Sequence, residues 1–135
     1  MDIQILQERY ADLILKRGIN IQKGGIVYIT CEAYGRDFAT LLAKKAYELG
    51  AKYVSLDLID ERVVKYRLQY SNDEGLTFVP DYLKVKLDEV VDKKISRISL
   101  ICPEDPDIIK DEDPKKINLM SFVFHQTEKL QKNLP

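Results

Sequence analysis

Six carboxylates gather between Ile101 and Pro114, in the stretch ICPEDPDIIKDEDP. They are Glu104, Asp105, Asp107, Asp111, Glu112 and Asp113. Clustered carboxylates can bind a divalent cation, act as an acid and base pair, or begin helices. When a calcium-binding EF-hand loop is aligned on Asp105, lysine replaces both the turn glycine, at Lys110, and the bidentate glutamate, at Lys116. The stretch therefore does not match that calcium motif.

The same stretch contains two Asp-Pro pairs, Asp105–Pro106 and Asp113–Pro114. An aspartate at the N-cap accepts backbone N–H bonds, and a proline at the first helical position has no N–H to leave unpaired. The pairs predict a short helix after Asp105, over residues 106–110, and a long final helix over about 114–133. The acidic stretch is interpreted as two helix starts.

Nucleophilic and zinc chemistry have few candidates in this sequence. Cys31 and Cys102 each end an apolar, β-branched run, and the only histidine is His125. The spacing forms no CxxC pair, no HExxH motif and no GxSxG elbow. The two cysteines are predicted to be buried free thiols of a cytoplasmic protein. A Cys–His pair formed by Cys31 or Cys102 with His125 stays open.

Nucleotide, nucleic-acid and membrane partners are not expected. The turn TCEAYGRDF has one glycine, and Glu32 places a negative charge where a phosphate would bind. The net charge is −1, and no dense run of Lys or Arg supplies the field that phosphate backbones require. No window approaches the roughly 18 apolar residues of a spanning helix.

The elements that must position these residues follow an α/β pattern. Apolar β-branched runs predict strands over 26–31, 52–59 and 96–102, the first of them buried on both faces. Helical spacing predicts helices over 3–17, 36–49, 60–71 and 80–94, with left-handed stop glycines at Gly18 and Gly50. The prediction is one small three-layer domain over 1–135, with a parallel sheet of about three strands flanked by helices. It is Rossmann-like without a nucleotide motif, and its strand order is 2-1-3.

Ligands of such sheets bind at the carboxyl ends of the strands. Those ends read CEAYG, IDER and CPEDP. Four residues at these ends are therefore candidates for the rim of a substrate cleft: Glu32, Tyr34, Glu104 and Asp105.

Three segments in order resemble one family of enzymes. They are YADLILKRGINIQKGGIVYIT, FATLLAKKAYELGAKYVSLDLIDERVVKYRLQYS and LICPEDPDIIKDEDPKKI. The family is the thermophilic-type metalloaminopeptidases, the aminopeptidase T and aminopeptidase S group, and the resemblance covers about residues 5–130. The acidic stretch departs from the family pattern at Cys102-Pro103-Glu104.

The resemblance implies an N-terminal α/β domain of a longer, two-domain, dimeric enzyme that removes N-terminal residues from peptides. It implies divalent ions, zinc, cobalt or magnesium, held in a C-terminal domain that this chain lacks. It assigns no catalytic or metal-binding residue to this chain, which is expected to wall the substrate cleft and to be inactive alone. The expected partners are a peptide substrate, the chain's own C-terminal domain and a second copy. A free-standing binding or interaction domain of the same fold is the alternative.

Overall fold

The computed structural model describes residues 2–101 and 107–120. The chain divides into two compact units. The first unit comprises Met1–Ile59 and Ile95–Glu104, and the second comprises Asp60–Lys94 and Asp105–Pro135. The prediction of a single domain over 1–135 stays a prediction.

The first unit contains a parallel sheet of three strands, β1 (Ile26–Glu32), β2 (Tyr53–Ile59) and β3 (Ser96–Leu100). The strand order is β2-β1-β3, as the sequence predicts. In the register of the sheet, Val27 on the central strand lies opposite Val54 on β2 and Ser96 on β3. The α/β fold, with a parallel sheet flanked by helices, is confirmed.

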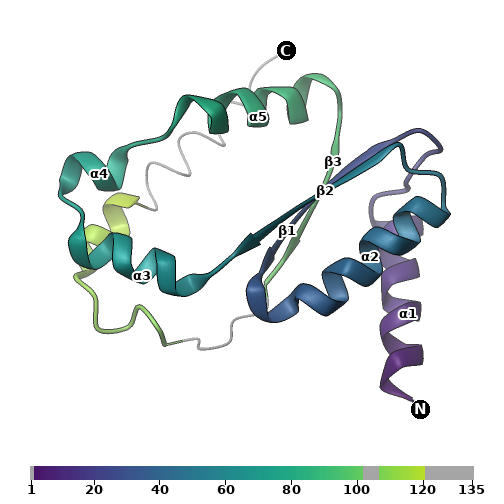
Figure 1. Cartoon of the computed structure of the whole chain (residues 1–135), viewed down its shortest axis with the longest axis horizontal. Helices are drawn as coiled ribbons and strands as arrows, with labels where there is room; N and C mark the ends of the chain where they lie inside the picture. The colour runs from purple at the N-terminus through teal and green to yellow at the C-terminus, as the bar shows by residue number, and fades with distance from the viewer. Residues whose placement is uncertain (1, 102–106, 121–135) are drawn as a thin grey trace. The chain divides into compact units, whose positions relative to one another are not determined.

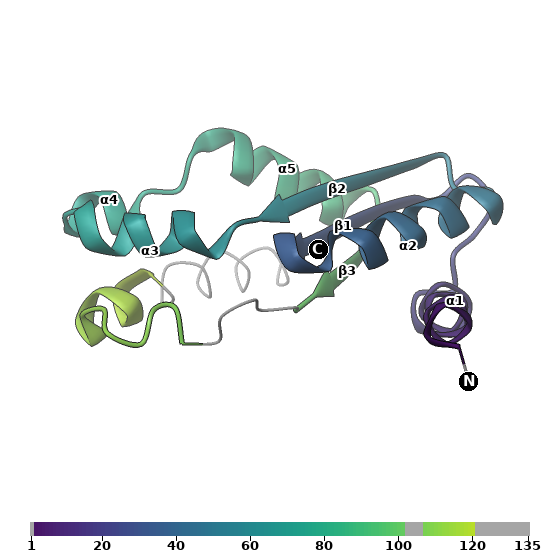
Figure 2. The same cartoon turned by 60° about the horizontal axis from the view of Figure 1, so that its bottom comes forward.

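Helices α1 (Ile3–Leu13) and α2 (Arg36–Glu48) belong to this unit, and Figure 1 shows α2 running alongside the strands. The Asp2 carboxylate caps α1 by accepting a bond from the Gln4 N–H at 3.1 Å. Figure 2 shows α1 nearly end-on. The Lys45 ammonium lies 3.1 Å from the Asp12 carboxylate and ties α2 to α1.

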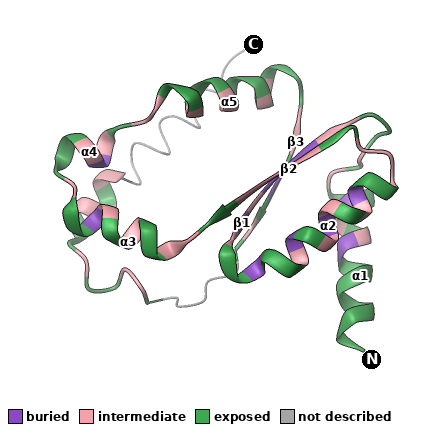
Figure 3. Cartoon of the chain, viewed as in Figure 1, coloured by how far each residue is buried: buried purple, intermediate pink, exposed green. Residues whose placement is uncertain are grey.

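The core forms where α1 and α2 meet one face of the sheet. Leu42, on α2, and Ile29, on β1, are completely buried. Purple segments in Figure 3 mark buried residues on α1, α2 and the strands. The cluster consists of Ala11, Leu15, Val27, Ile29, Cys31, Ala39, Leu42, Ala46 and Ile98. Small alanines at these positions let helix and sheet approach closely.

The face of α1 that carries the apolar spacing is not the buried one. Ile3 is 71% exposed and Tyr10 57% exposed, whereas Ala11 and Leu15 are fully buried. The helix over 3–17 is therefore confirmed, but four apolar residues at helical spacing on α1 remain about half or more exposed: Ile3, Leu6, Tyr10 and Leu13. Its contact with the core comes from the small Ala11 and from Ile14 and Leu15, which lie in a π-helical turn over Ile14–Gly18.

One of the two predicted stop glycines is confirmed. Gly50 is left-handed, with φ of 97°, and its carbonyl accepts a bond from the Gly24 N–H at 2.7 Å. Gly18 is not left-handed; Asn20 takes that conformation instead, with φ of 45°. The π-helical turn explains the shift, because the Ile19 N–H donates five residues back to the Ile14 carbonyl at 2.9 Å.

The second unit is helical in its described residues. It contains α3 (Glu61–Tyr70), α4 (Asp73–Thr77) and α5 (Asp81–Asp92), and residues 114–120 are also helical. Helix α4 lies between the predicted helices over 60–71 and 80–94, where the sequence predicts no element. The Asn72 side chain caps α4 by accepting the Gly75 N–H at 2.8 Å, but five residues are too few to show helical periodicity.

Candidate functional site

The carboxyl end of the central strand carries two of the four predicted rim residues. β1 ends at Glu32, and a short 3-10 helix, Ala33–Gly35, leads directly into α2. Tyr34 stands on that turn with 72% of its surface exposed. Oxygen Oε2 of Glu32 is buried, and no described residue donates a hydrogen bond to it. The end of β1 therefore presents an exposed aromatic ring and a carboxylate with an unsatisfied oxygen.

The other two predicted rim residues, Glu104 and Asp105, lie outside the described residues, as do Cys102 and His125. Of the four predicted rim residues, the structure describes Glu32 and Tyr34, which are two positions apart in the sequence. Their prediction as cleft-rim residues stays a prediction, as does that of Glu104 and Asp105.

The acidic stretch is a helix start in the part that is described. Asp113 accepts the Lys115 N–H at 2.9 Å, and the helical segment begins at residue 114, so the second Asp-Pro cap is confirmed. Residues 107–110 form a hydrogen-bonded turn rather than the predicted short helix, with the Lys110 N–H donating to the Asp107 carbonyl at 3.0 Å. Glu112 accepts a bond from the Gln69 amide at 2.9 Å. The carboxylates of Glu112 and Asp113 therefore have structural partners in the second unit.

Metal and thiol chemistry have little support in the described residues. Across residues 2–101 and 107–120, no group of three or more His, Cys, Asp or Glu could hold a metal ion. Cys31 is a free thiol, 1% exposed, and its Sγ–H donates to the Glu32 carbonyl at 3.0 Å. A buried thiol is a poor nucleophile because it is inaccessible and its charged form is disfavoured. The predicted burial is confirmed for Cys31.

Among the helices of the described part, none combines the length and the apolarity that crossing a membrane requires.

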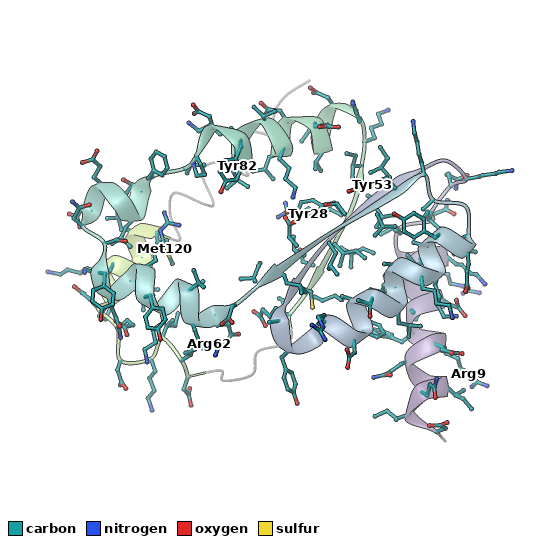
Figure 4. The ribbon with its side chains drawn as sticks, viewed as in Figure 1. Arg9, Tyr28, Tyr53, Arg62, Tyr82 and Met120 are labelled. Carbon is teal, nitrogen blue, oxygen red and sulfur yellow. The ribbon has the colours of Figure 1, made fainter. Side chains whose placement is uncertain are left out.

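One described carboxylate has a strongly lowered pKa. Hydrogen bonds from the Arg62 side chain, and then from the Arg62 backbone N–H, lower the pKa of Asp60 from 3.8 to about 2. The Arg62 guanidinium approaches the carboxylate to 2.6 Å, and the backbone N–H to 2.9 Å. Figure 4 labels Arg62 near the start of α3. The pair caps this helix, so its low pKa has a structural cause.

We expect the Asp60 carboxyl to titrate with a midpoint of about 2 and the Arg62→Met variant to titrate nearer the ordinary value, because the charged donor is gone. Because the pKa of Asp60 is lower in the folded state, its carboxylate cap stabilises the folded state above about pH 4. This stabilisation is lost as the pH falls toward 2. Carboxyl carbon chemical shifts, followed by NMR against pH, measure both midpoints. An identical midpoint in the variant would show that the guanidinium does not cause the shift.

An apolar hollow of about 450 Å³ is lined by Leu6, Gln7 and Tyr10 of α1 and by Phe38 of α2. The rings of Tyr10 and Phe38 stack with their centroids 5.7 Å apart. Ligand pockets combine apolar walls with a few polar groups that fix orientation, and the lining residues of this hollow offer only the Gln7 amide and the Tyr10 hydroxyl. The carboxyl end of β1 is therefore the better candidate for a site.

Sequence interpretation missed a set of polar side chains on the sheet face opposite the core. The Tyr28 hydroxyl donates to Asp57 at 2.7 Å, and the Thr30 hydroxyl donates to Ser99 at 3.2 Å. Figure 4 shows Tyr28 on the side of the strands away from α2. We call Tyr28, Thr30, Glu32, Asp57 and Ser99 the polar row. The alternation of Tyr28, Thr30 and Glu32 along β1 was the available signal.

Comparison with known proteins adds the family context. The sequence profile described as thermophilic metalloprotease (M29) matches residues 4–133. Aminopeptidase AmpS of Bacillus subtilis is 32% identical over 108 residues, which cover 80% of this chain and 26% of that protein. Aminopeptidase 2 of Geobacillus stearothermophilus is 30% identical over 110 residues, 82% of this chain and 26% of that protein. The chain thus spans about a quarter of the length of these relatives.

A solved structure agrees with the sequence matches. Wild-type AmpT from Thermus thermophilus superimposes with a TM-score of 0.85 at 25% identity. The superposition covers 97% of this chain and 33% of that chain. Fold and sequence therefore point to the same group of proteins.

Proposed function

Because this chain belongs to the thermophilic metalloprotease (M29) family, we propose that it forms the N-terminal α/β domain of a metal-dependent aminopeptidase. Relatives named as aminopeptidases support the activity. The main support for the role of the domain is its superposition on one third of AmpT with a TM-score of 0.85. The parent enzyme would hydrolyse the N-terminal residue from unblocked peptides.

The domain's contribution is to bind and orient peptide rather than to perform the bond cleavage. In metallopeptidases, divalent ions supply Lewis-acid chemistry to the scissile carbonyl and to the attacking water. The described residues form no ligand set for such an ion, so no catalytic step is assigned to them. Zinc, cobalt or magnesium would be held by a C-terminal domain, and the carboxyl end of this sheet would wall the cleft beside it.

The proposal extends to assembly and location. The complete enzyme is proposed to be a cytoplasmic homodimer in which this domain packs against its own C-terminal domain. These proposals follow from the resemblance stated in the sequence analysis, and the buried thiol of Cys31 suits a reducing compartment.

The test compares two polypeptides with L-leucine p-nitroanilide as substrate, each assayed with zinc, cobalt or magnesium. We expect the 135-residue chain to give no turnover, and the complete reading frame that contains it to give turnover that a chelator abolishes. Metal-dependent turnover by the 135-residue chain alone would refute the absence of catalytic ligands. An inactive complete protein would refute the peptidase function. A stop codon directly after Pro135 would favour the free-standing binding domain.

A further inference from the structure

The polar row shows that the face of the sheet opposite the core is built from paired groups. The Tyr28–Asp57 bond joins β1 to β2, and the Thr30–Ser99 bond joins β1 to β3. Both bonds cross from one strand to the next, so polar side chains on this face find partners within the sheet. The Tyr28–Asp57 bond is partly buried, and buried polar groups in folded proteins are generally satisfied in this way.

Glu32 is the exception in this row. Its oxygen Oε2 is buried, yet no hydrogen-bond donor among the described residues reaches it. A buried carboxylate oxygen without a hydrogen-bond donor is unfavourable, and a cationic donor offsets this cost. Oε2 of Glu32 is therefore an acceptor whose hydrogen bond a positively charged donor could supply.

The position of Glu32 also indicates ligand binding. Glu32 is the last residue of β1, the central strand of the order β2-β1-β3. From β1 the chain continues to β2, which lies on one side of β1, and later to β3, which lies on the other side. In parallel sheets, ligands bind at the carboxyl ends of the strands where the order reverses in this manner. The burial of Oε2 and the strand order are independent observations that identify the same place.

We propose that the Glu32 carboxylate binds a primary ammonium group of a peptide. This inference rests on the proposed function, because aminopeptidase substrates are unblocked peptides. A primary ammonium is a compact charge with three N–H donors, and it suits a single unsatisfied oxygen better than the planar two-pronged guanidinium does. The ammonium can come from the peptide N-terminus or from a lysine side chain. Tyr34, two residues later in the chain, is an exposed aromatic residue.

The test uses the 135-residue chain and three small probes. L-leucinamide carries only an α-ammonium, Nα-acetyl-L-lysinamide carries only a side-chain ammonium, and Nα-acetyl-L-leucinamide carries neither. Amide chemical shifts of residues 31–34 are followed by NMR during each titration. We expect saturable shifts with at least one of the two charged probes and none with the uncharged probe. The probe that binds identifies the source of the ammonium.

Matched variants test the role of the charge. Glu32→Gln keeps the shape but removes the charge, and should weaken binding about tenfold or more. Glu48→Gln removes an exposed carboxylate on α2 and should leave binding unchanged.

Added NaCl should weaken binding to the wild-type chain, a readout that remains if Glu32→Gln does not fold. No saturable shift with either charged probe, equal shifts with the uncharged probe, or no effect of Glu32→Gln would each overturn the inference. The hydrolysis assay of the complete enzyme is separate, so the proposed function can stand if this inference fails.

Discussion

Replacement of Leu42 by alanine should destabilise the first unit by about 3 kcal/mol. Leu42 is fully buried on α2, within the core cluster that includes Ile29 and Ala46. Alanine favours the helix, so the loss reports the cavity that the missing atoms leave behind. A domain of this size is typically stable by only about 5–15 kcal/mol, so a loss of this size is a large share of the total.

Urea unfolding followed by circular dichroism measures this loss as a lower midpoint, by about 1.5 M, at an unchanged slope. The matched control is Leu6→Ala, on α1, because Leu6 is 49% exposed and should lose about 1 kcal/mol or less. Equal losses in the two variants would contradict the assignment of the core to the contact between α2 and the sheet.

Replacement of Arg67 by methionine should loosen the second unit, with a loss of about 2 kcal/mol. The Arg67 Nη2 donates to three backbone carbonyls, those of Gly75 at 2.9 Å, Leu76 at 3.3 Å and Phe78 at 3.0 Å. These carbonyls lie at the end of α4 or just beyond it, where no helical N–H can reach them. Methionine keeps the length of the apolar stem and removes all of these donors.

The local effect appears as faster amide hydrogen exchange in α3 and α4, while exchange in β1 stays as in the wild type. Arg62→Met is the matched control on the same helix, because the Arg62 side chain is 72% exposed and surface pairs contribute about 0.2–1 kcal/mol. If both variants accelerated exchange equally, the three carbonyl bonds of Arg67 would have no special role.

The sheet could be predicted from the sequence because its signals are local and strong. Apolar β-branched runs mark β1 and β2, the segment between them is a helix that ends at left-handed Gly50, and right-handed crossovers limit the possible strand orders. Burial within helices was harder to predict. On α3, helical spacing places Val63, Tyr66 and Tyr70 along one side, but all three are exposed, and Leu68 is the buried residue. Periodicity finds a helix, but only tertiary contacts decide which face is covered.

Two residues of the candidate site could be proposed from the sequence, and their role stays a prediction. Glu32 and Tyr34 followed from the rule that ligands bind at the carboxyl ends of strands. The pairing of Tyr28 with Asp57 could not be predicted, because it depends on the register that places strands 29 residues apart side by side. The buried state of Glu32 Oε2 also depends on three-dimensional packing, which spacing along the chain does not encode.

The strand order has a consequence for how the polypeptide assembles during synthesis. Thr30 and Ser99, bonded across β1 and β3, are 69 residues apart, whereas Tyr28 and Asp57, across β1 and β2, are 29 apart. Closing the longer loop costs about 0.8 kcal/mol more chain entropy. At ordinary elongation rates, the ribosome needs about 2 to 7 s to make the segment that separates β2 from β3. For that time β1 has one unpaired backbone edge, the kind of edge on which nascent chains associate.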